Sequence, residues 1–139
     1  MQEIFYQGSM LIFEIHSIPR PQRKTQWNRN RAYDPSFDAK ESIRWQLRPH
    51  APKELLRGPL HVNMHFYLPI PKITKKHIRA QMINGIVLPY KRPDLDNLAY
   101  LVTNAMIDIV YIDDSQIVNL NLRKRYAEIP KTVIEVQEL

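Results

Sequence analysis

The sequence has no cysteine and no long uninterrupted run of apolar residues. The absence of cysteine excludes disulfide bonds and thiolate metal sites, and it is typical of a protein from a reducing compartment. No apolar run is long enough to span a bilayer, and no secretory signal peptide is evident. We therefore expect a cytoplasmic protein with no membrane partner.

Acidic residues are also in the minority. The chain has 20 lysines and arginines against 14 aspartates and glutamates, a formal net charge of +6, which favours an anionic partner. Residues 19–35, here called the basic segment, carry several of these cations together with Trp27 and Tyr33. Phosphates pair with arginine and lysine, and bases stack on aromatic rings. This mixture predicts contact with DNA; the alternative is a solvated loop with Trp27 folded onto the core. The basic residues that we expect to contact DNA are Arg20, Arg23, Lys24, Arg29, Arg31, Lys91, Arg92 and Lys124.

The acidic residues include two tight pairs. Asp94 and Asp96 form the first pair, within Pro-Asp-Leu-Asp-Asn-Leu, and Asp113 and Asp114 form the second pair, within Asp-Asp-Ser-Gln-Ile. Carboxylates a few ångströms apart repel each other unless a cation neutralises them, and Mg²⁺ takes oxygen ligands of this kind. The two pairs therefore predict a divalent-metal site. The alternative is that they serve as a helix cap and a surface turn.

The spacing between the two pairs allows them to meet. The proline before Asp94 favours an extended approach, in which residues two apart share a face. Asp96 or Asn97 can then cap a helix over 97–107, which would rise about 16 Å at roughly 1.5 Å per residue. A returning strand over 109–113 covers about the same length at roughly 3.3 Å per residue. We therefore expect the second pair to lie beside the first.

Hydrophobic periodicity predicts the remaining elements. Alternation of apolar and polar residues indicates strands, and apolar residues three and four apart indicate helices. The expected elements are strands at 11–16, 60–68, 118–123 and 131–137, a helix over 36–48 capped by Ser36, and a short helix from a Thr74 cap to Ile83. This order of elements predicts an α+β fold, with a mixed β-sheet and helices packed against one face.

A chain of 139 residues supports a single small domain with a modest core. We expect that domain to occupy residues 10–139. Residues 1–9, Met-Gln-Glu-Ile-Phe-Tyr-Gln-Gly-Ser, look like the altered remnant of an expression tag ahead of a natural Met10, and we assign them no function.

The two acidic motifs and the helix between them resemble the RusA family of Holliday-junction resolvases. The resemblance extends upstream, where residues 18–24 and 31–35 are similar to the family's basic N-terminal loop, and it covers roughly residues 11–137. It implies an endodeoxyribonuclease that depends on Mg²⁺, with Mn²⁺ as an alternative metal. It also implies a homodimer, encoded by a bacterium or a phage, that cleaves four-way DNA junctions in recombination and repair.

The expected reaction, hydrolysis of a phosphodiester at carboxylate-bound Mg²⁺, suggests a role for each of the four acids. The metal lowers the pKa of a water, polarises the phosphate and stabilises the leaving oxygen. We expect all four acids to be catalytic, with Asp94, Asp96 and Asp114 as metal ligands. Asp113 is either a fourth ligand or a residue directly behind the ligands. The number of ions, one or two, stays open.

The sequence departs from the family within the helix. The lysine that usually follows the second motif aspartate by four residues is Tyr100 here, the aspartate four residues later is Asn104, and Ile107-Asp108 replaces the usual Asn-Gly. The family lysine is tied to catalysis, so we hypothesise that a cation from the following strand replaces it. The candidates for this cation are Arg123, Lys124 and Arg125.

Two other functions stay open. The first is a RusA-like protein that binds branched DNA with impaired catalysis, because Tyr100 and Asn104 replace the family's lysine and aspartate. The second is a metal-dependent hydrolase of a nucleotide or another small phosphate ester, which would need a concave pocket at the acids.

Overall fold

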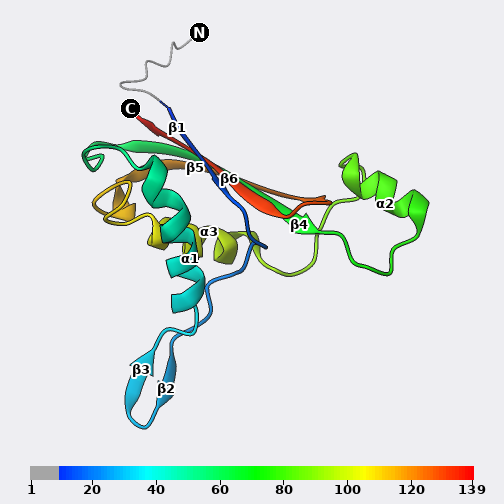
Figure 1. The fold of residues 1–139 in the computed structure, drawn as a ribbon, viewed down its shortest axis with the longest axis horizontal. Coiled ribbons are helices and arrows are strands. Elements are labelled where there is room, and N and C mark those ends of the chain that lie inside the picture. The colour runs from blue at the N-terminus through cyan, green and yellow to red at the C-terminus, as the bar shows by residue number, and fades with distance from the viewer. Residues whose placement is uncertain (1–9) are drawn as a thin grey trace.

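The computed structural model describes residues 10–139, and it shows a mixed four-stranded sheet with helices on one face (Figure 1). The strands of the sheet are β1 (Leu11–Ile15), β4 (Leu60–Pro69), β5 (Ile117–Ala127) and β6 (Lys131–Glu138). Their order is β1-β6-β4-β5, with β4 and β5 parallel and the other neighbours antiparallel. The predicted α+β fold is confirmed. The predicted expression-tag remnant at residues 1–9 lies outside the described residues.

Two helices, α1 (Phe37–Leu47) and α3 (Leu95–Ala105), cover one face of the sheet (Figure 1). Every second side chain of β4 points to this face and is buried, from Leu60 to Leu68. One apolar stripe of α3 is also buried, and it consists of Leu98, Leu101, Val102 and Ala105. Burying each large apolar side chain contributes about 1.5–3 kcal/mol. This packing fixes α3, whose N-terminus carries the first acid pair.

The third helix, α2 (Lys76–Ile83), stands beyond the ends of the strands, away from α1 and α3 (Figure 1). Its N-cap is Lys75. The predicted cap at Thr74 is wrong, because the Thr74 hydroxyl donates to the Pro71 carbonyl oxygen at 2.6 Å. None of the helices in the described part of the chain is both long and apolar enough to cross a membrane. The described residues also form two 3-10 turns, η1 (Arg48–His50) and η2 (Asp114–Gln116).

The strand predicted over residues 109–113 is not formed. After α3 the chain turns back tightly, because Ile107 and Tyr111 form an isolated β-bridge and Asp108 between them has a φ of 66°. Val110 and Tyr111 are both fully buried, whereas adjacent side chains of a strand point to opposite faces. A turn can direct both side chains inward, so the chain does not return along the length of the helix.

The basic segment forms a hairpin that the sequence did not predict. β2 (Gln26–Asn28) pairs antiparallel with β3 (Arg31–Tyr33), and the hairpin projects away from the sheet and the helices (Figure 1). Its turn residues, Arg29 and Asn30, have φ values of 49° and 65°, as in a type I′ turn. Such turns usually carry Asn-Gly or Asp-Gly, so Arg-Asn is a weak signal. Trp27 is 72% exposed, which excludes the alternative that it folds onto the core.

Replacing Leu98 by alanine tests how firmly α3 is held. Leu98 is fully buried, and truncating a buried leucine costs about 2–5 kcal/mol. We expect Leu98→Ala to lower the free energy of unfolding by that amount in urea denaturation. Ile73→Ala is the control, because Ile73 is 100% exposed and its truncation should change stability by less than about 0.5 kcal/mol. Equal effects of the two substitutions would contradict this account of the core.

Candidate metal and nucleic-acid site

The first acid pair lies at the N-terminus of α3. Asp94 is the N-cap residue, with φ −69° and ψ 137°, and Asp96 lies in the first turn. The expectation that Asp96 or Asn97 caps the helix is wrong, because the helix starts before both residues. Asp94 makes no side-chain cap hydrogen bond, and both acids are exposed. Their carboxylates lie at the helix end where the helix dipole favours negative charge.

The second acid pair begins the turn η2. The Asp113 carboxylate accepts a hydrogen bond from the Ser115 N–H at 3.2 Å, and Gln116 Oε1 accepts one from the Asp113 N–H at 2.9 Å. Together they form a capping box. The hydrogen bonds from Ser115 hold the pKa of Asp113 below its ordinary value. Gln116 Nε2 also donates to two carbonyl oxygens of the loop before β4, at 2.9 and 3.0 Å. Asp113 therefore shapes the turn that carries Asp114.

A buried tyrosine connects the second pair to the far half of α3. Tyr111 is fully buried, and its hydroxyl donates to the Thr103 carbonyl oxygen at 2.5 Å. Burial raises the pKa of the Tyr111 hydroxyl, and the charges of Asp114 and Asp113 raise it further. The hydroxyl therefore stays protonated and keeps its hydrogen bond. From Asp94 to Thr103 the helix rises about 14 Å at roughly 1.5 Å per residue.

The two acid pairs lie at opposite ends of α3. β5 starts just after the second pair and extends about 23 Å from Ile117 to Lys124, at roughly 3.3 Å per residue. There Lys124 Nζ donates to the carbonyl oxygens of Lys91 (2.7 Å) and Pro93 (2.8 Å), directly before Asp94. Among the described residues, no group of three or more histidine, cysteine, aspartate or glutamate side chains could hold a metal ion. The expected meeting of the two pairs therefore does not occur within this single chain.

Of the three candidate cations on β5, Lys124 faces the helices. It lies level with Phe66 of β4, whose side chain is buried under the helices. Arg123 and Arg125 point to the opposite face of the sheet, because side chains alternate along a strand. Lys124 therefore brings a positive charge to the loop before Asp94, and its ammonium group holds two carbonyl oxygens there.

The basic segment is attached to the same end of α3. The Gln22 N–H donates to the Asn97 carbonyl oxygen at 3.0 Å, and Asn97 directly follows Asp96. A groove runs between the segment and the helix, and Arg23 and Tyr100 are among the residues that line it. Tyr100 is 51% exposed, so one of the positions that depart from the family lies in this groove. The basic segment and the first acid pair thus share one surface.

Asp34 anchors the base of the hairpin. Its carboxylate accepts hydrogen bonds from Gln22 Nε2 (2.9 Å), the Ser36 N–H (2.9 Å) and Lys40 Nζ (2.5 Å). The buried Lys40 ammonium holds the pKa of Asp34 below its ordinary value. Ser36 is the N-cap residue of α1, as predicted, but its side chain makes no cap hydrogen bond. Its Oγ accepts instead from the Arg23 N–H at 2.8 Å, which ties the basic segment to α1.

The residues predicted to contact DNA are exposed, apart from the half-buried Lys124. The exposed ones are Arg20, Arg23, Lys24, Arg29, Arg31, Lys91 and Arg92. Arg29 and Arg31 belong to the hairpin, and Lys91 and Arg92 directly precede the first acid pair. Their contact with DNA stays a prediction, and their exposure is what that contact requires.

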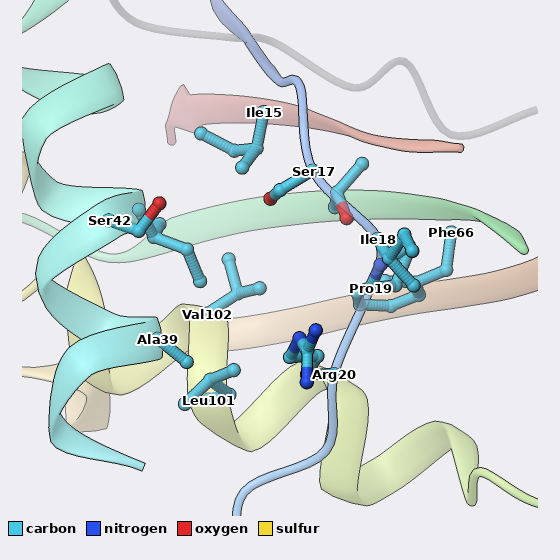
Figure 2. Close-up of a pocket in the computed structure, with 12 residues that line it drawn as sticks. Ile15, Ser17, Ile18, Pro19, Arg20, Ala39, Ser42, Phe66, Leu101 and Val102 are labelled. Carbon is cyan, nitrogen blue, oxygen red and sulfur yellow. The ribbon is translucent and has the colours of Figure 1, made fainter. Parts of the chain in front are cut away.

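An apolar pocket lies between the end of β1, α1 and α3 (Figure 2). Ala39 of α1 and Leu101 and Val102 of α3 line it, with Arg20 where the chain leaves β1. Its volume is about 100 Å³, whereas pockets for small molecules measure about 300–1,000 Å³. None of the four acids lines it. This pocket therefore gives no support to a hydrolase of small phosphate esters.

The sequence matches one protein family over most of its length and one curated relative over part of it. A family model described as endodeoxyribonuclease RusA matches residues 14–137, a range that includes both acid pairs and the basic segment. The chain is also 33% identical over 94 residues to the "uncharacterized protein YqaN" of Bacillus subtilis (strain 168). That match covers 65% of this chain and 65% of the relative, so it spans slightly less than two thirds of the relative's length. The relative's name states no activity.

Substitution of Lys124 tests its structural role. Lys124→Met removes both hydrogen bonds to the loop before Asp94, and hydrogen bonds from a charged group contribute about 1.5–3 kcal/mol. We expect a loss of that size in the free energy of unfolding, measured in urea. Arg123→Met is the matched control on the same strand, and its exposed side chain should contribute less than about 0.5 kcal/mol. A smaller effect for Lys124→Met than for the control would refute the anchoring role.

The Asp34 anchor makes stability depend on pH in a defined direction. The pKa of Asp34 is lower in the folded protein than its ordinary value of 3.8, which applies in the unfolded chain. Its contribution is therefore fully present above that value and is lost as the pH falls through the lower folded pKa. We expect the wild type to be more stable than Asp34→Asn at neutral pH, and the difference to shrink below pH 3.8. Thermal unfolding at a series of pH values measures this, and a difference that stays constant into strong acid would contradict it.

Proposed function

The chain belongs to the RusA family of endodeoxyribonucleases, and we propose from this premise that it is a Mg²⁺-dependent endonuclease that resolves four-way (Holliday) DNA junctions in recombination and repair. The observation that carries the proposal is the attachment of the basic segment to the N-terminal end of α3, which carries Asp94 and Asp96. The hydrogen bond from the Gln22 N–H to the Asn97 carbonyl oxygen makes this attachment. A DNA strand held by the exposed cations of that segment would pass beside Asp94 and Asp96. The cytoplasm of a bacterium is the proposed place of action.

The proposed metal ligands are Asp94, Asp96 and Asp114, with Asp113 positioning Asp114. The donor set fits Mg²⁺, which takes carboxylate oxygens and is commonly held by one or two carboxylates together with waters and substrate phosphates. Mn²⁺ accepts the same ligands. Asp94 is suited to this role because no cap hydrogen bond occupies its carboxylate. The bound metal supplies Lewis acidity toward the phosphate and lowers the pKa of the attacking water.

The other residues of the site bind and orient the DNA. Exposed arginines and lysines pair with phosphates, which sets the position of the DNA without reading its sequence. Lys124 holds the loop before Asp94 through the carbonyl oxygens of Lys91 and Pro93, and so fixes the first acid pair relative to β5. Selectivity for a four-way junction then comes from the shape and deformability of the DNA.

A second copy of the chain is proposed to complete each metal site. One chain offers two of the four carboxylates at either end of α3. β5 is an edge strand, and its Val118 and Leu120 are 64% and 41% exposed. Native proteins usually cover or charge such edges. Two β5 edges paired antiparallel about a two-fold axis would bring the start of one strand, with its Asp114, beside the end of the other, with its Asp94. Such a dimer would also present two sites to a nearly two-fold junction.

A second candidate function is binding of branched DNA with impaired cleavage. Tyr100 stands where the family usually has the lysine tied to catalysis, and its exposed ring lines the groove beside Arg23. Lys124, the candidate replacement on β5, donates to two carbonyl groups. This candidate predicts tight junction binding that weakens steeply with salt, and no product that depends on Mg²⁺.

Cleavage of a labelled four-way junction decides between the two candidates. With Mg²⁺ we expect paired symmetric cuts, and a linear duplex of the same sequence should stay intact. Asp96→Asn should lower the cleavage rate by at least about 100-fold, because it removes a metal ligand. Glu54→Gln is the control, since this exposed acid lies in the loop before β4 and should leave the rate unchanged. Tight junction binding without cuts, in Mg²⁺ and in Mn²⁺, would favour the second candidate.

Mixing two inactive variants tests whether the site is shared between chains. Asp96→Asn and Asp114→Asn should each be inactive alone. In a mixed dimer one site would combine both substitutions, and the other would combine the intact first pair of one chain with the intact second pair of its partner. We therefore expect the mixture to nick the junction at one strand. A mixture as inactive as its components, with exchange of subunits demonstrated, would place each site within one chain.

A further inference from the structure

The hairpin of β2 and β3 adds nothing to the core. Every residue of both strands is exposed, and the hairpin extends into solvent (Figure 1). A two-stranded hairpin is marginally stable by itself in water. Its base is nevertheless fixed, because Asp34 binds Gln22 and Lys40 on either side of it. A projecting element on a fixed base is suited to contact a partner.

Trp27 is the large apolar side chain of this hairpin, and it has no cover. Its cross-strand neighbour is Ala32, which offers a single methyl group. Tyr33 points to the other face of the hairpin, because side chains alternate along a strand. There its hydroxyl donates to Gln26 Oε1 at 2.9 Å. Trp27 is therefore 72% exposed, and its indole ring is accessible to a flat partner.

The tip of the hairpin carries a cation in an unfavourable backbone conformation. Arg29 has a φ of 49° and Asn30 a φ of 65°, the left-handed region that favours glycine and asparagine. Asparagine is common there, whereas arginine is not. Arg31 follows directly, with its side chain on the Tyr33 face of the hairpin, so the hairpin carries two guanidinium groups within a few residues of Trp27. An exposed aromatic ring on an element that also carries cations matches a nucleotide, with a flat base and an anionic phosphate.

We propose that Trp27 is a stacking pin that inserts at the branch point of the DNA and stacks on a base there, while Arg29 and Arg31 pair with the adjacent phosphates. The inference rests on the proposed function and adds to it the residue that recognises the branch. In a linear duplex each base is covered by its neighbours, whereas a branch point leaves base faces that a ring can cover. Stacking tolerates any base, so the pin would favour branched DNA without choosing a sequence.

The hairpin is also connected to the first acid pair, which would fix the distance from Trp27 to Asp94 and Asp96. Gln22 links the base of the hairpin to Asn97, one residue beyond Asp96, and Asp34 binds Gln22 as well. The distance between the pin and the first acid pair is therefore set by the protein. A pin held at the branch would place the cut at a constant number of nucleotides from it.

Tryptophan fluorescence tests the pin directly, because the chain has two tryptophans. Trp45→Phe leaves Trp27 as the sole emitter, and Trp27→Phe leaves Trp45, which is 69% exposed on α1 and serves as the matched control. Both proteins are titrated with a four-way junction and with a linear duplex in EDTA, so that no cleavage occurs. We expect the junction to quench Trp27 emission by about half or more, and to leave Trp45 emission unchanged. Trp27→Ala should bind the junction about tenfold more weakly and bind the duplex as the wild type does.

Each other outcome counts against the pin. If the wild type binds the junction while Trp27 emission and the affinity of Trp27→Ala are unchanged, the pin is wrong and the proposed function stands. Equal losses of affinity on junction and duplex would overturn the assignment of branch recognition to Trp27. A wild type with no affinity for the junction would overturn the pin and the proposed function together. Urea denaturation of Trp27→Ala checks that the exposed position leaves folding unaffected.

Discussion

The N-terminus of α3 is held from three sides, and the site depends on this restraint. Packing of Leu98 and its neighbours under the sheet fixes the helix. The ammonium of Lys124 holds the two carbonyl groups before Asp94, and the basic segment is bonded to the first turn through Gln22. Like charges that lie close together repel, so this support helps to keep Asp94 and Asp96 in place. The same restraint fixes the base of the hairpin relative to the first acid pair, so the proposed metal binding and the proposed DNA contact would share one support.

The rigidity of α3 is also the reason for proposing that two chains complete each metal site. The first acid pair lies at one end of α3, and the buried Tyr111 holds the second pair near the other end through Thr103. Helices do not bend to bring their ends together, so a metal site built from both pairs would need a second copy of the chain. The open edge of β5 offers a surface for that meeting, with Val118 and Leu120 exposed on it. In the proposed dimer, two-fold symmetry would pair opposite ends of α3 without any change within either chain.

Sequence patterns predicted the elements whose periodicity reflects burial on one face. β4 alternates and α3 carries its apolar stripe as expected. The prediction of a strand over residues 109–113 failed, because apolar content alone cannot distinguish a strand from a turn with consecutive buried residues. The hairpin was missed because Arg29-Asn30 lacks the glycine of a common type I′ turn. The acid pairs were proposed as a site from their chemistry, whereas their separation is set by the length of α3 and by the Tyr111 hydrogen bond, which no local pattern reveals.

Binding of Mn²⁺ followed by electron paramagnetic resonance, across a dilution series of the protein, tests the central claim most directly. If two chains share each site, the fraction of bound Mn²⁺ should fall in step with the fraction of dimer, measured in parallel by sedimentation. Leu120→Asp, which places a charge on the exposed edge of β5, should lower both together. Mn²⁺ binding that stays equally tight in the dissociated chain, and that is lost in Asp96→Asn, would show that one chain suffices and would contradict the account.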